Sequence, residues 1–306
     1  MRFIEGEQLR AGLSMTAAVD ALETAFGRED PSLIAPMRTS LATPAGTLLT
    51  MPAAGDAGVG IKLVTLSEFN PQRGLPFVHA VYVLFDPRTQ EPEAVFDGAE
   101  LTALRTAAVS GLATRHLANP DASHLLLFGA GVQAAAHLDA MLAVRPVREA
   151  TIVGRTPSRV EALIARARSL GVDARAGTPE DVGTADLICT CTTSAVSVFN
   201  GQDLPGGAHI NAVGAYLAHQ RELDTETIRR AKVVVETREV ALSEAGDLVI
   251  PMHEGAIEAS HIVADLAEIV RGRTVREHAS DVTAFVSVGF AFEDLVVARA
   301  ALEALA

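Results

Sequence analysis

The pattern of apolar and polar positions divides the chain into two regions of different periodicity. Between about residues 119 and 240, short apolar runs alternate with helical segments, which is typical of a doubly wound parallel sheet. The predicted strands are His124–Phe128, Thr151–Val153, Val172–Arg175, Asp186–Cys191, His209–Val213 and Lys232–Glu236. The predicted helices are Val132–Leu142, Pro157–Leu170 and Thr225–Arg230. Six strands with one crossover each would complete a sheet of this Rossmann type.

The first region has a different pattern, in which alternating stretches predict a mostly antiparallel sheet. Its predicted elements are the helix Ser14–Phe26, the strands Thr47–Met51, Gly60–Leu66 and Phe77–Phe85, and the helix Ala99–Leu117. The last helical stretch, from Val288 to the C-terminus, is expected to pack back onto this region. We therefore predict an α/β protein with two domains. Residues 1–118 and 289–306 would form a discontinuous α+β domain, and residues 119–288 a Rossmann domain.

Composition and charge restrict the class of protein. The 306 residues suffice for two cores, and 49% of them are apolar. A net charge of −13 argues against a nucleic-acid or anionic-membrane partner, because its field would repel phosphates. Charged residues near the start and the absence of a long apolar run lead us to expect a cytoplasmic protein without a membrane segment. His253 and His261 lack the spacing of a helical metal pair, so we expect no metal.

The segment after the first predicted parallel strand carries a specific chemical signal. In Gly129-Ala-Gly131-Val-Gln-Ala134, the first glycine permits a tight turn and the second removes a side chain where a pyrophosphate would approach. The small Ala134 allows close packing of helix and strand. Free N–H groups at the helix start, around Val132 and Gln133, would face the anion. These five positions therefore predict a dinucleotide-binding site.

The residues after the second strand predict which nicotinamide cofactor binds. A site selective for NAD usually places an acidic residue here to bind the ribose 2′-hydroxyl. This chain instead has Arg155, Thr156 and Arg159, together with Ser158, which suit a 2′-phosphate. NADP(H) is therefore favoured and NAD(H) stays open, while the alternative is that these arginines form a solvated loop.

Polar residues also follow the fourth predicted strand. Thr192, Thr193 and Ser194 lie just past its carboxyl end, where folds of this kind bind the cofactor. We predict cofactor contacts for all three, with simple loop capping as the alternative.

Three cations stand out in the first domain. Lys62 lies between apolar neighbours in an alternating run, Arg105 lies in a helix almost free of other charges, and Arg38 follows Ala35-Pro-Met. A charge among apolar residues is costly unless it has a partner, and a bound carboxylate would be suitable. Each alone also fits a salt-bridged or snorkelling residue. Together they indicate a site for a small acid.

These features occur together in a known family. The chain resembles the ornithine cyclodeaminase and μ-crystallin family along nearly its whole length. The matching positions are Arg38, Gly60-Ile-Lys62, Asn70, Gly74-Leu-Pro76, Leu104-Arg105-Thr-Ala-Ala108, Gly129 to Ala134 with His137, Thr192-Thr-Ser194, Asn211-Ala-Val-Gly214, Glu244-Ala-Gly-Asp247, Ser287-Val-Gly289 and Glu293-Asp294.

The resemblance implies a homodimer whose first domain both dimerises and holds the substrate. It also implies that Arg38 and Arg105 bind an α-carboxylate and that Lys62 transfers a proton. By the same resemblance, Val213, Ser287 and Gly289 lie beside the cofactor. The chemistry of the residues agrees, because guanidinium groups suit carboxylates and a desolvated lysine near other cations has a lowered pKa.

One departure from the family pattern affects the expected reaction. In the ornithine and lysine cyclodeaminases of this family, and in an alanine dehydrogenase, an aspartate handles the substrate amine where this chain has Tyr216. A phenol is a poor base at neutral pH. Glu68, His79 and Glu222 could replace the aspartate, although surface carboxylates and a sheet histidine are the commoner interpretation.

The resemblance and this departure favour an NAD(P)H-dependent ketimine reductase. Its substrate would be Δ1-pyrroline-2-carboxylate or Δ1-piperideine-2-carboxylate, reduced to the L-amino acid. The alternatives are an ornithine or lysine cyclodeaminase with bound NAD, an alanine dehydrogenase-like enzyme, and a non-enzymatic μ-crystallin-like binding protein.

Overall fold

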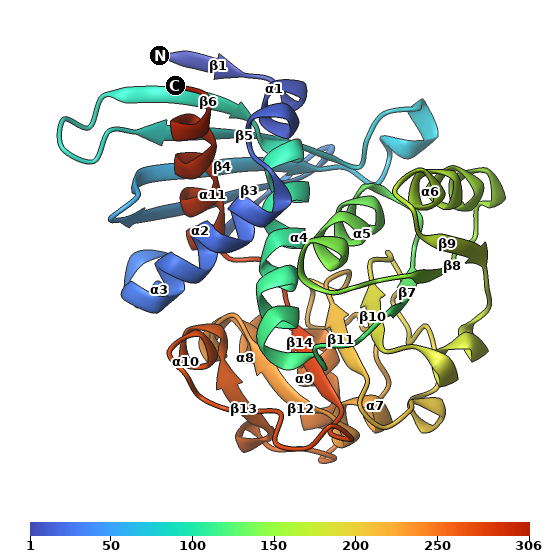
Figure 1. Ribbon diagram of the computed structural model, residues 1–306. Helices are drawn as coiled ribbons and strands as arrows, with labels where there is room; N and C mark the ends of the chain where they lie inside the picture. The colour runs from blue at the N-terminus through green and yellow to red at the C-terminus, as the bar shows by residue number, and fades with distance from the viewer. The chain divides into compact units, whose positions relative to one another are not determined.

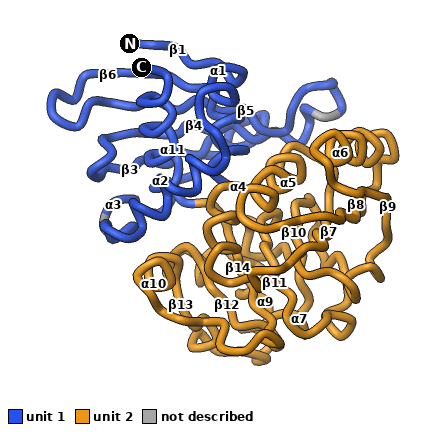
Figure 2. The backbone as a smooth tube through the Cα atoms, in the orientation of Figure 1, with its two compact units in different colours: residues 1–106, 290–306 blue, residues 107–289 orange. Residues whose placement is uncertain are grey.

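The chain divides into two compact units in the computed structural model (Figure 2). Unit 1 comprises residues 1–106 and 290–306, and unit 2 comprises residues 107–289. The structure describes the backbone of all 306 residues and every side chain except those of Ser32, Leu33 and Pro71. Within the described residues, no helix has both the length and the apolar character that a membrane crossing requires.

The first boundary between the units falls inside a helix, α4 (Gly98–Leu117), whereas the boundary predicted from the sequence lies after that helix, at residue 118. The second half of α4 belongs to unit 2 because its polar side chains bond there. Ser110 Oγ lies 2.9 Å from His137 Nε2, and Thr114 Oγ1 accepts a hydrogen bond from Asn211 Nδ2. A continuous helix carries no sequence signal for a boundary of this kind.

Unit 1 is built around a six-stranded sheet in the order β1-β6-β5-β4-β3-β2 (Figure 1). All neighbouring strands are antiparallel except β1 and β6, which are parallel. The strands are β1 (Arg2–Ile4), β2 (Thr39–Thr43), β3 (Gly46–Gly55), β4 (Gly58–Leu66), β5 (Val78–Phe85) and β6 (Pro92–Asp97). The helices are α1 (Gly6–Gly12), α2 (Met15–Arg28), α3 (Pro31–Ile34), the short η1 (Pro71–Arg73), the first half of α4, and α11 (Ala291–Ala304).

The core of unit 1 lies between this sheet and α11. Helix α11 packs against β3, β4, β5 and α2, so the end of the chain covers strands from its beginning, as expected. The ring of Phe292 on α11 meets that of Phe26 on α2 edge to face, with centroids 5.1 Å apart. Alternation along β4 turns Gly60, Lys62 and Val64 toward this core.

Unit 2 contains an eight-stranded, fully parallel sheet in the order β13-β12-β14-β11-β10-β7-β8-β9. Its strands are β7 (His124–Phe128), β8 (Glu149–Val153), β9 (Asp173–Ala176), β10 (Leu187–Thr190), β11 (His209–Ala212), β12 (Lys232–Val235), β13 (Ile262–Asp265) and β14 (Thr283–Val286). Its helices are α5 (Val132–Val144), α6 (Pro157–Ser169), α7 (Thr225–Arg230), α8 (Arg238–Glu244), α9 (Gly246–His253) and α10 (Leu266–Val270), with short turns η2 (Pro179–Thr184), η3 (Gly201–Asp203) and η4 (Ala259–His261).

The parallel sheet confirms the predicted fold class, and all six predicted strands are present. The prediction that six strands make up the full sheet is wrong, because the sheet has eight strands, with β14 between β11 and β12 and β13 beyond β12. The chain passes from β12 through α8, α9, α10 and β13 before it returns as β14. β13 and β14 were not predicted, although with four residues each they are as long as β9, β10, β11 and β12. Their places in the sheet follow from tertiary pairing and not from a local pattern.

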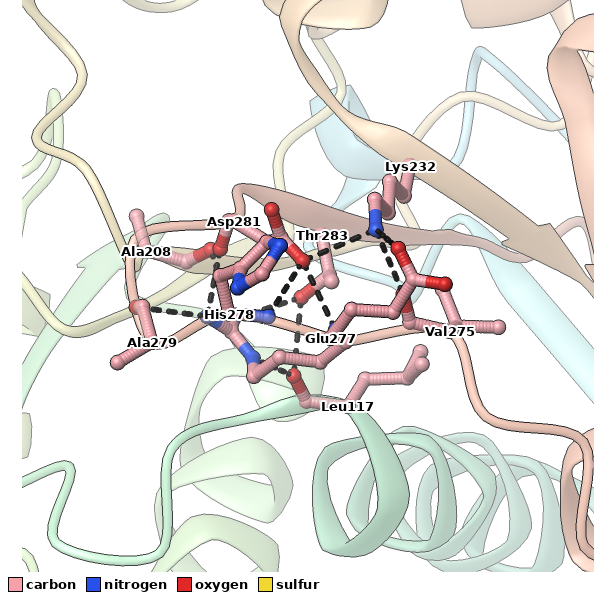
Figure 3. A network of polar contacts seen from close by, with 10 residues as sticks. Leu117, Ala208, Lys232, Val275, Glu277, His278, Ala279, Asp281 and Thr283 are labelled. Atoms are coloured by element: carbon pink, nitrogen blue, oxygen red, sulfur yellow. Dashed lines mark hydrogen bonds and ion pairs between the residues drawn. The ribbon is translucent and has the colours of Figure 1, made fainter.

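A network of polar contacts joins segments at the end of the parallel sheet where its strands begin (Figure 3). The guanidinium of Arg276 donates to the carbonyls of Leu117, Ala208 and Asp281 and to Thr283 Oγ1. In the same network, the first residue of β12, Lys232, binds Glu277 and Asp281. The strand starts are therefore locked by side chains, and cofactor chemistry is expected at the opposite edge, where parallel strands end.

Candidate functional site

The glycine turn after β7 has the geometry that a pyrophosphate requires. Gly129 has φ +107°, and a Cβ there would lie 2.6 Å from the carbonyl oxygen of Cys191, so only glycine fits. Gly131 is the N-cap of α5, and a Cβ there would meet no atom within 4 Å. Ala134 is fully buried where the helix packs on the sheet. The turn is therefore closely packed at Gly129 and open at Gly131. An open backbone at the start of a helix fits a bound dinucleotide.

The start of α5 is held by a buried histidine. His137 Nδ1 lies 2.8 Å from the carbonyl oxygen of Gln133, and Nε2 lies 2.9 Å from Ser110 Oγ. Burial lowers the pKa of His137 to about 4, so the ring is neutral at physiological pH. The match of His137 to the family thus has a structural explanation, because the ring connects α5 to α4.

The candidate residues for cofactor selectivity follow β8 in an exposed turn. Arg155, Thr156 and Arg159 are all exposed, and Pro157 opens α6 with Thr156 as its N-cap. The Thr156 side chain makes no capping hydrogen bond. A Cβ at Gly154 would lie 3.5 Å from that of Ala130, so this turn adjoins the glycine turn. The chain thus brings these cations beside the predicted pyrophosphate position.

The donors of the segment after β10 are bonded within the protein. Thr192 donates from both its backbone N–H and its hydroxyl to Glu222 Oε1, at 2.7 and 2.6 Å. Ser194 Oγ donates to the carbonyl of Val196, while Thr193 is exposed. Glu222 also accepts from the N–H of Gly214, at 2.8 Å. The interpretation of Glu222 as a surface carboxylate is wrong, because its side chain is fully buried.

A second buried carboxylate organises the segment after β14. Glu236, directly after β12, accepts from Ser287 Oγ at 2.6 Å and from the N–H groups of Val288 and Gly289 at 3.1 and 3.0 Å. Gly289 has φ +82°, which explains the glycine at this position. Val213, half-buried just after β11, donates to the carbonyl of Thr190. The predicted cofactor residues thus cluster at the carboxyl ends of neighbouring strands.

In unit 1, Lys62 and Arg105 meet two acidic residues on α11. Lys62 Nζ lies 2.9 and 2.8 Å from the two carboxylate oxygens of Asp294. Arg105 Nη1 donates to Glu293 Oε2 at 2.7 Å, and its Nε lies 3.3 Å from Asp294 Oδ1. All four side chains are buried. They form a charge-balanced cluster, here called the unit 1 tetrad.

The sheet register explains how Lys62 comes to lie under α11. Lys62 pairs with Met51 on β3 and with Tyr82 on β5, and all three side chains are buried on one face. A Cβ at Gly60 would lie 2.0 Å from the Tyr82 hydroxyl, so glycine leaves room for this ring. Arg38 is half-buried just before β2, and extending the β2–β3 register by one residue brings it level with Met51.

The tetrad sets the acidity of Lys62. Its pKa is lowered to about 8, mainly by burial and then by the charge of Arg105, while Asp294 opposes the shift. Lys62 is therefore mostly protonated at neutral pH and close to losing its proton. This is the range in which a side chain both gives and takes protons efficiently.

Glu293, Asp294 and Glu236 have no role that was predicted from the sequence. The first two stand in an otherwise apolar run, Phe290-Ala-Phe-Glu-Asp-Leu-Val-Val297. That is the same signal, a charge among apolar residues, that singled out Lys62 and Arg105. This signal marks Glu293 and Asp294 as candidates for buried charges, but it does not identify the cations with which they pair.

The open glycine turn at the carboxyl edge of a doubly wound sheet defines a Rossmann-type protein. The ornithine cyclodeaminase/mu-crystallin family model matches residues 4–306. The chain belongs to this family.

Individual relatives within the family are similar over most of their length. The chain is 39% identical to a Δ1-pyrroline-2-carboxylate reductase of Bacillus cereus (strain ZK / E33L) over 275 residues, covering 87% of the chain and 84% of the relative. It is 35% identical to the mouse ketimine reductase mu-crystallin, covering 97% and 95%. The solved Δ1-pyrroline-2-carboxylate reductase of Thermococcus litoralis, in complex with NADH and L-proline, has a TM-score of 0.93 and 36% identity, covering 99% and 97%.

The tetrad yields a prediction for stability. Asp294→Asn would leave the buried Lys62 ammonium without its carboxylate and is expected to lower the free energy of unfolding by about 3 kcal/mol. Lys62→Met is expected to cost a similar amount. In urea denaturation, the double variant should be more stable than the sum of the single losses predicts, by at least about 1.5 kcal/mol.

Glu303→Gln, at an exposed position of the same helix, is the matched control and should leave stability unchanged. Strict additivity of Asp294→Asn and Lys62→Met would show that the two charges are not coupled.

Proposed function

We propose that this protein reduces a small cyclic imino acid, Δ1-pyrroline-2-carboxylate or its six-membered homologue, to the L-amino acid with a reduced nicotinamide cofactor. The observation that carries the proposal is the full-length similarity to a reductase bound to NADH and L-proline. The buried tetrad and the open glycine turn support it, because they supply acid chemistry and a dinucleotide site.

The substrate-binding chemistry is assigned to unit 1. Arg105, fixed by Glu293, and Arg38 bind the substrate carboxylate, since a planar guanidinium matches the two oxygens of a carboxylate. Lys62 donates a proton to the imine nitrogen. When bound, the nicotinamide supplies a hydride to the C=N carbon. Hydride and proton together would convert the C=N double bond into a secondary amine, and the cofactor would leave in its oxidised form.

The cofactor is assigned to unit 2. Gly129, Gly131, Val132, Gln133 and Ala134 hold the pyrophosphate at the start of α5. NADP(H) is preferred over NAD(H), since Arg155, Thr156 and Arg159 offer exposed donors and cations beside that turn. Thr193 and Val213 lie at the strand ends where the remainder of the cofactor binds.

Reduction is favoured over cyclodeamination by Tyr216. Cyclodeamination needs a base that deprotonates a distal amine, and the resemblance to the family implies that the half-buried Tyr216 stands in place of the aspartate. Glu222 does not substitute, because its carboxylate accepts hydrogen bonds from Thr192 and Gly214.

The protein is proposed to act as a homodimer through the sheet face opposite α11. On that face Leu41 is 62% and Val81 is 42% exposed. Exposed apolar side chains on a sheet favour burial against a partner. Light scattering on the purified protein is expected to give twice the chain mass of 32.0 kDa, and a monomer at micromolar concentration would contradict the proposal.

The reaction is tested by following the oxidation of NADPH and NADH with Δ1-pyrroline-2-carboxylate and by identifying L-proline as the product. The wild type is expected to turn over, and Lys62→Met to lose at least a hundredfold in kcat/KM. Ammonia and proline formed from L-ornithine without net change in the nicotinamide would show a cyclodeaminase instead. A requirement for free ammonium with a 2-oxo acid would show an amino acid dehydrogenase.

The pH profile tests Lys62 as the proton donor. The donor must be protonated, so kcat/KM for imine reduction is expected to fall as the pH rises through about 8. Because Asp294 raises the pKa of Lys62, Asp294→Asn should move this fall to lower pH. The same alkaline fall in the residual activity of Lys62→Met would exclude Lys62 as its source.

Cofactor selectivity is tested with Arg155→Glu. The new carboxylate would repel a 2′-phosphate, so the KM for NADPH should rise at least tenfold while that for NADH changes less than threefold. Steady-state kinetics with both cofactors measure this. Arg148→Glu serves as the control, because it makes the same change of charge at an exposed residue just before β8. Equal weakening of both cofactors would place the 2′-phosphate elsewhere.

A further inference from the structure

Two buried carboxylates in unit 2 are the basis of a further inference. Glu222 and Glu236 each accept three hydrogen bonds, and every donor lies in a segment that directly follows a strand of the parallel sheet. Glu222 is 0% and Glu236 is 2% exposed. Burying a carboxylate costs free energy because the group loses its hydration. This cost is offset only where charge-assisted hydrogen bonds replace the lost water.

Glu222 joins two neighbouring strand ends. Its Oε1 accepts from Thr192 after β10, and its Oε2 accepts from Gly214 after β11. A Cβ at Gly214 would lie 2.5 Å from Glu222 Oε2 and 2.3 Å from the carbonyl oxygen of Thr192. Glycine at 214 is therefore needed for the carboxylate to approach.

Glu222 is in turn anchored by Asp247. The carboxylate of Asp247 accepts from the N–H groups of Glu222 and Leu223, both at 2.8 Å. A Cβ at Gly246 would lie 1.8 Å from the carbonyl oxygen of Gln220, so α9 begins in direct contact with this segment. The Gly246-Asp247 pair of the family motif thus fixes the chain that carries Glu222.

Glu236 acts in the same way on one further strand end. It follows β12 and gathers the hydroxyl of Ser287 and the N–H groups of Val288 and Gly289, which follow the adjacent β14. Together the two carboxylates fix the segments after β10, β11 and β14.

These segments belong to the second half of the Rossmann sheet. The glycine turn and Arg155 place the adenosine half of a dinucleotide over β7, β8 and β9, so its other half lies over β10, β11 and β14. We propose that Glu222 and Glu236 are positioning residues for the nicotinamide half of the cofactor, holding the loops that receive it in their binding conformation. This inference rests on the proposed function and adds two residues that do not themselves touch the substrate.

The test compares whole cofactor with a fragment that lacks nicotinamide. Glu222→Gln and Glu236→Gln keep the side-chain shape, but one NH2 group must then face an N–H donor in either amide orientation. The Kd values of NADH and NADPH are measured calorimetrically beside those of ADP-ribose and 2′-phospho-ADP-ribose. Glu239→Gln, exposed on α8 three residues from Glu236, is the matched control.

In both variants the Kd of the preferred dinucleotide is expected to rise at least tenfold, with the Kd of the matching fragment within twofold of wild type. Retained fragment binding shows that the variants are folded. Gly214→Ala, which keeps the carboxylate but blocks its approach, should reproduce the selective loss. Glu239→Gln should bind all four ligands as the wild type does.

Equal weakening of dinucleotide and fragment would show a merely structural role and overturn the inference, as would unchanged dinucleotide binding. Failure of the wild type itself to bind NADH or NADPH would instead overturn the proposed function, and the inference with it.

Discussion

Removing a carboxylate from water costs free energy unless cations or hydrogen-bond donors replace its hydration, and this constraint organises both units of the protein. In unit 1, Glu293 and Asp294 are buried against Arg105 and Lys62. In unit 2, Glu222 and Glu236 are buried and accept hydrogen bonds from backbone N–H and hydroxyl groups, with no cation among their hydrogen-bond partners in the described part of the chain. The same side-chain chemistry thus serves two purposes. In unit 1 the carboxylates influence the pKa of Lys62, and in unit 2 they bind the segments that follow the strands.

Pairing a buried carboxylate with cations and pairing it with neutral donors have different electrostatic consequences. The tetrad has no net charge, so burial and the charge of Arg105 lower the pKa of Lys62 without leaving an uncompensated charge in the core. In unit 2, burial raises the pKa of Glu222, while its hydrogen bonds to Thr192 and Gly214 oppose the shift. The buried Lys62 and the hydrogen-bonded segments of unit 2 are both in place without a ligand. Such preorganisation reduces the free energy that ordering costs on binding.

Much of this architecture could be predicted from periodicity. The strand at His124–Phe128 and the helix at Thr225–Arg230 have the predicted bounds, because a continuous apolar run and clear end signals mark them. β14 was not predicted, although it is as long as β9, β10, β11 and β12, and its insertion between β11 and β12 depends on tertiary pairing that no local pattern encodes. Lys62 and Arg105 were recognisable as charges in apolar surroundings. Their partners on α11 lie 188 or more residues away, and no local rule connects such distant positions. The role of Glu236 was equally hidden, because it depends on β14.

The discontinuity of unit 1 bears on how the chain folds during synthesis. Unit 2 is complete at residue 289, whereas the sheet of unit 1 receives α11 only from the last residues of the chain. Until α11 leaves the ribosome, Lys62 has no Asp294 to pair with, and the apolar face of β3, β4 and β5 lacks its cover. The part of the protein that is translated first is therefore the last to reach its native state, which reverses the usual vectorial order. A nascent chain of this kind exposes the apolar face of β3, β4 and β5 until residues 291–304 have been translated.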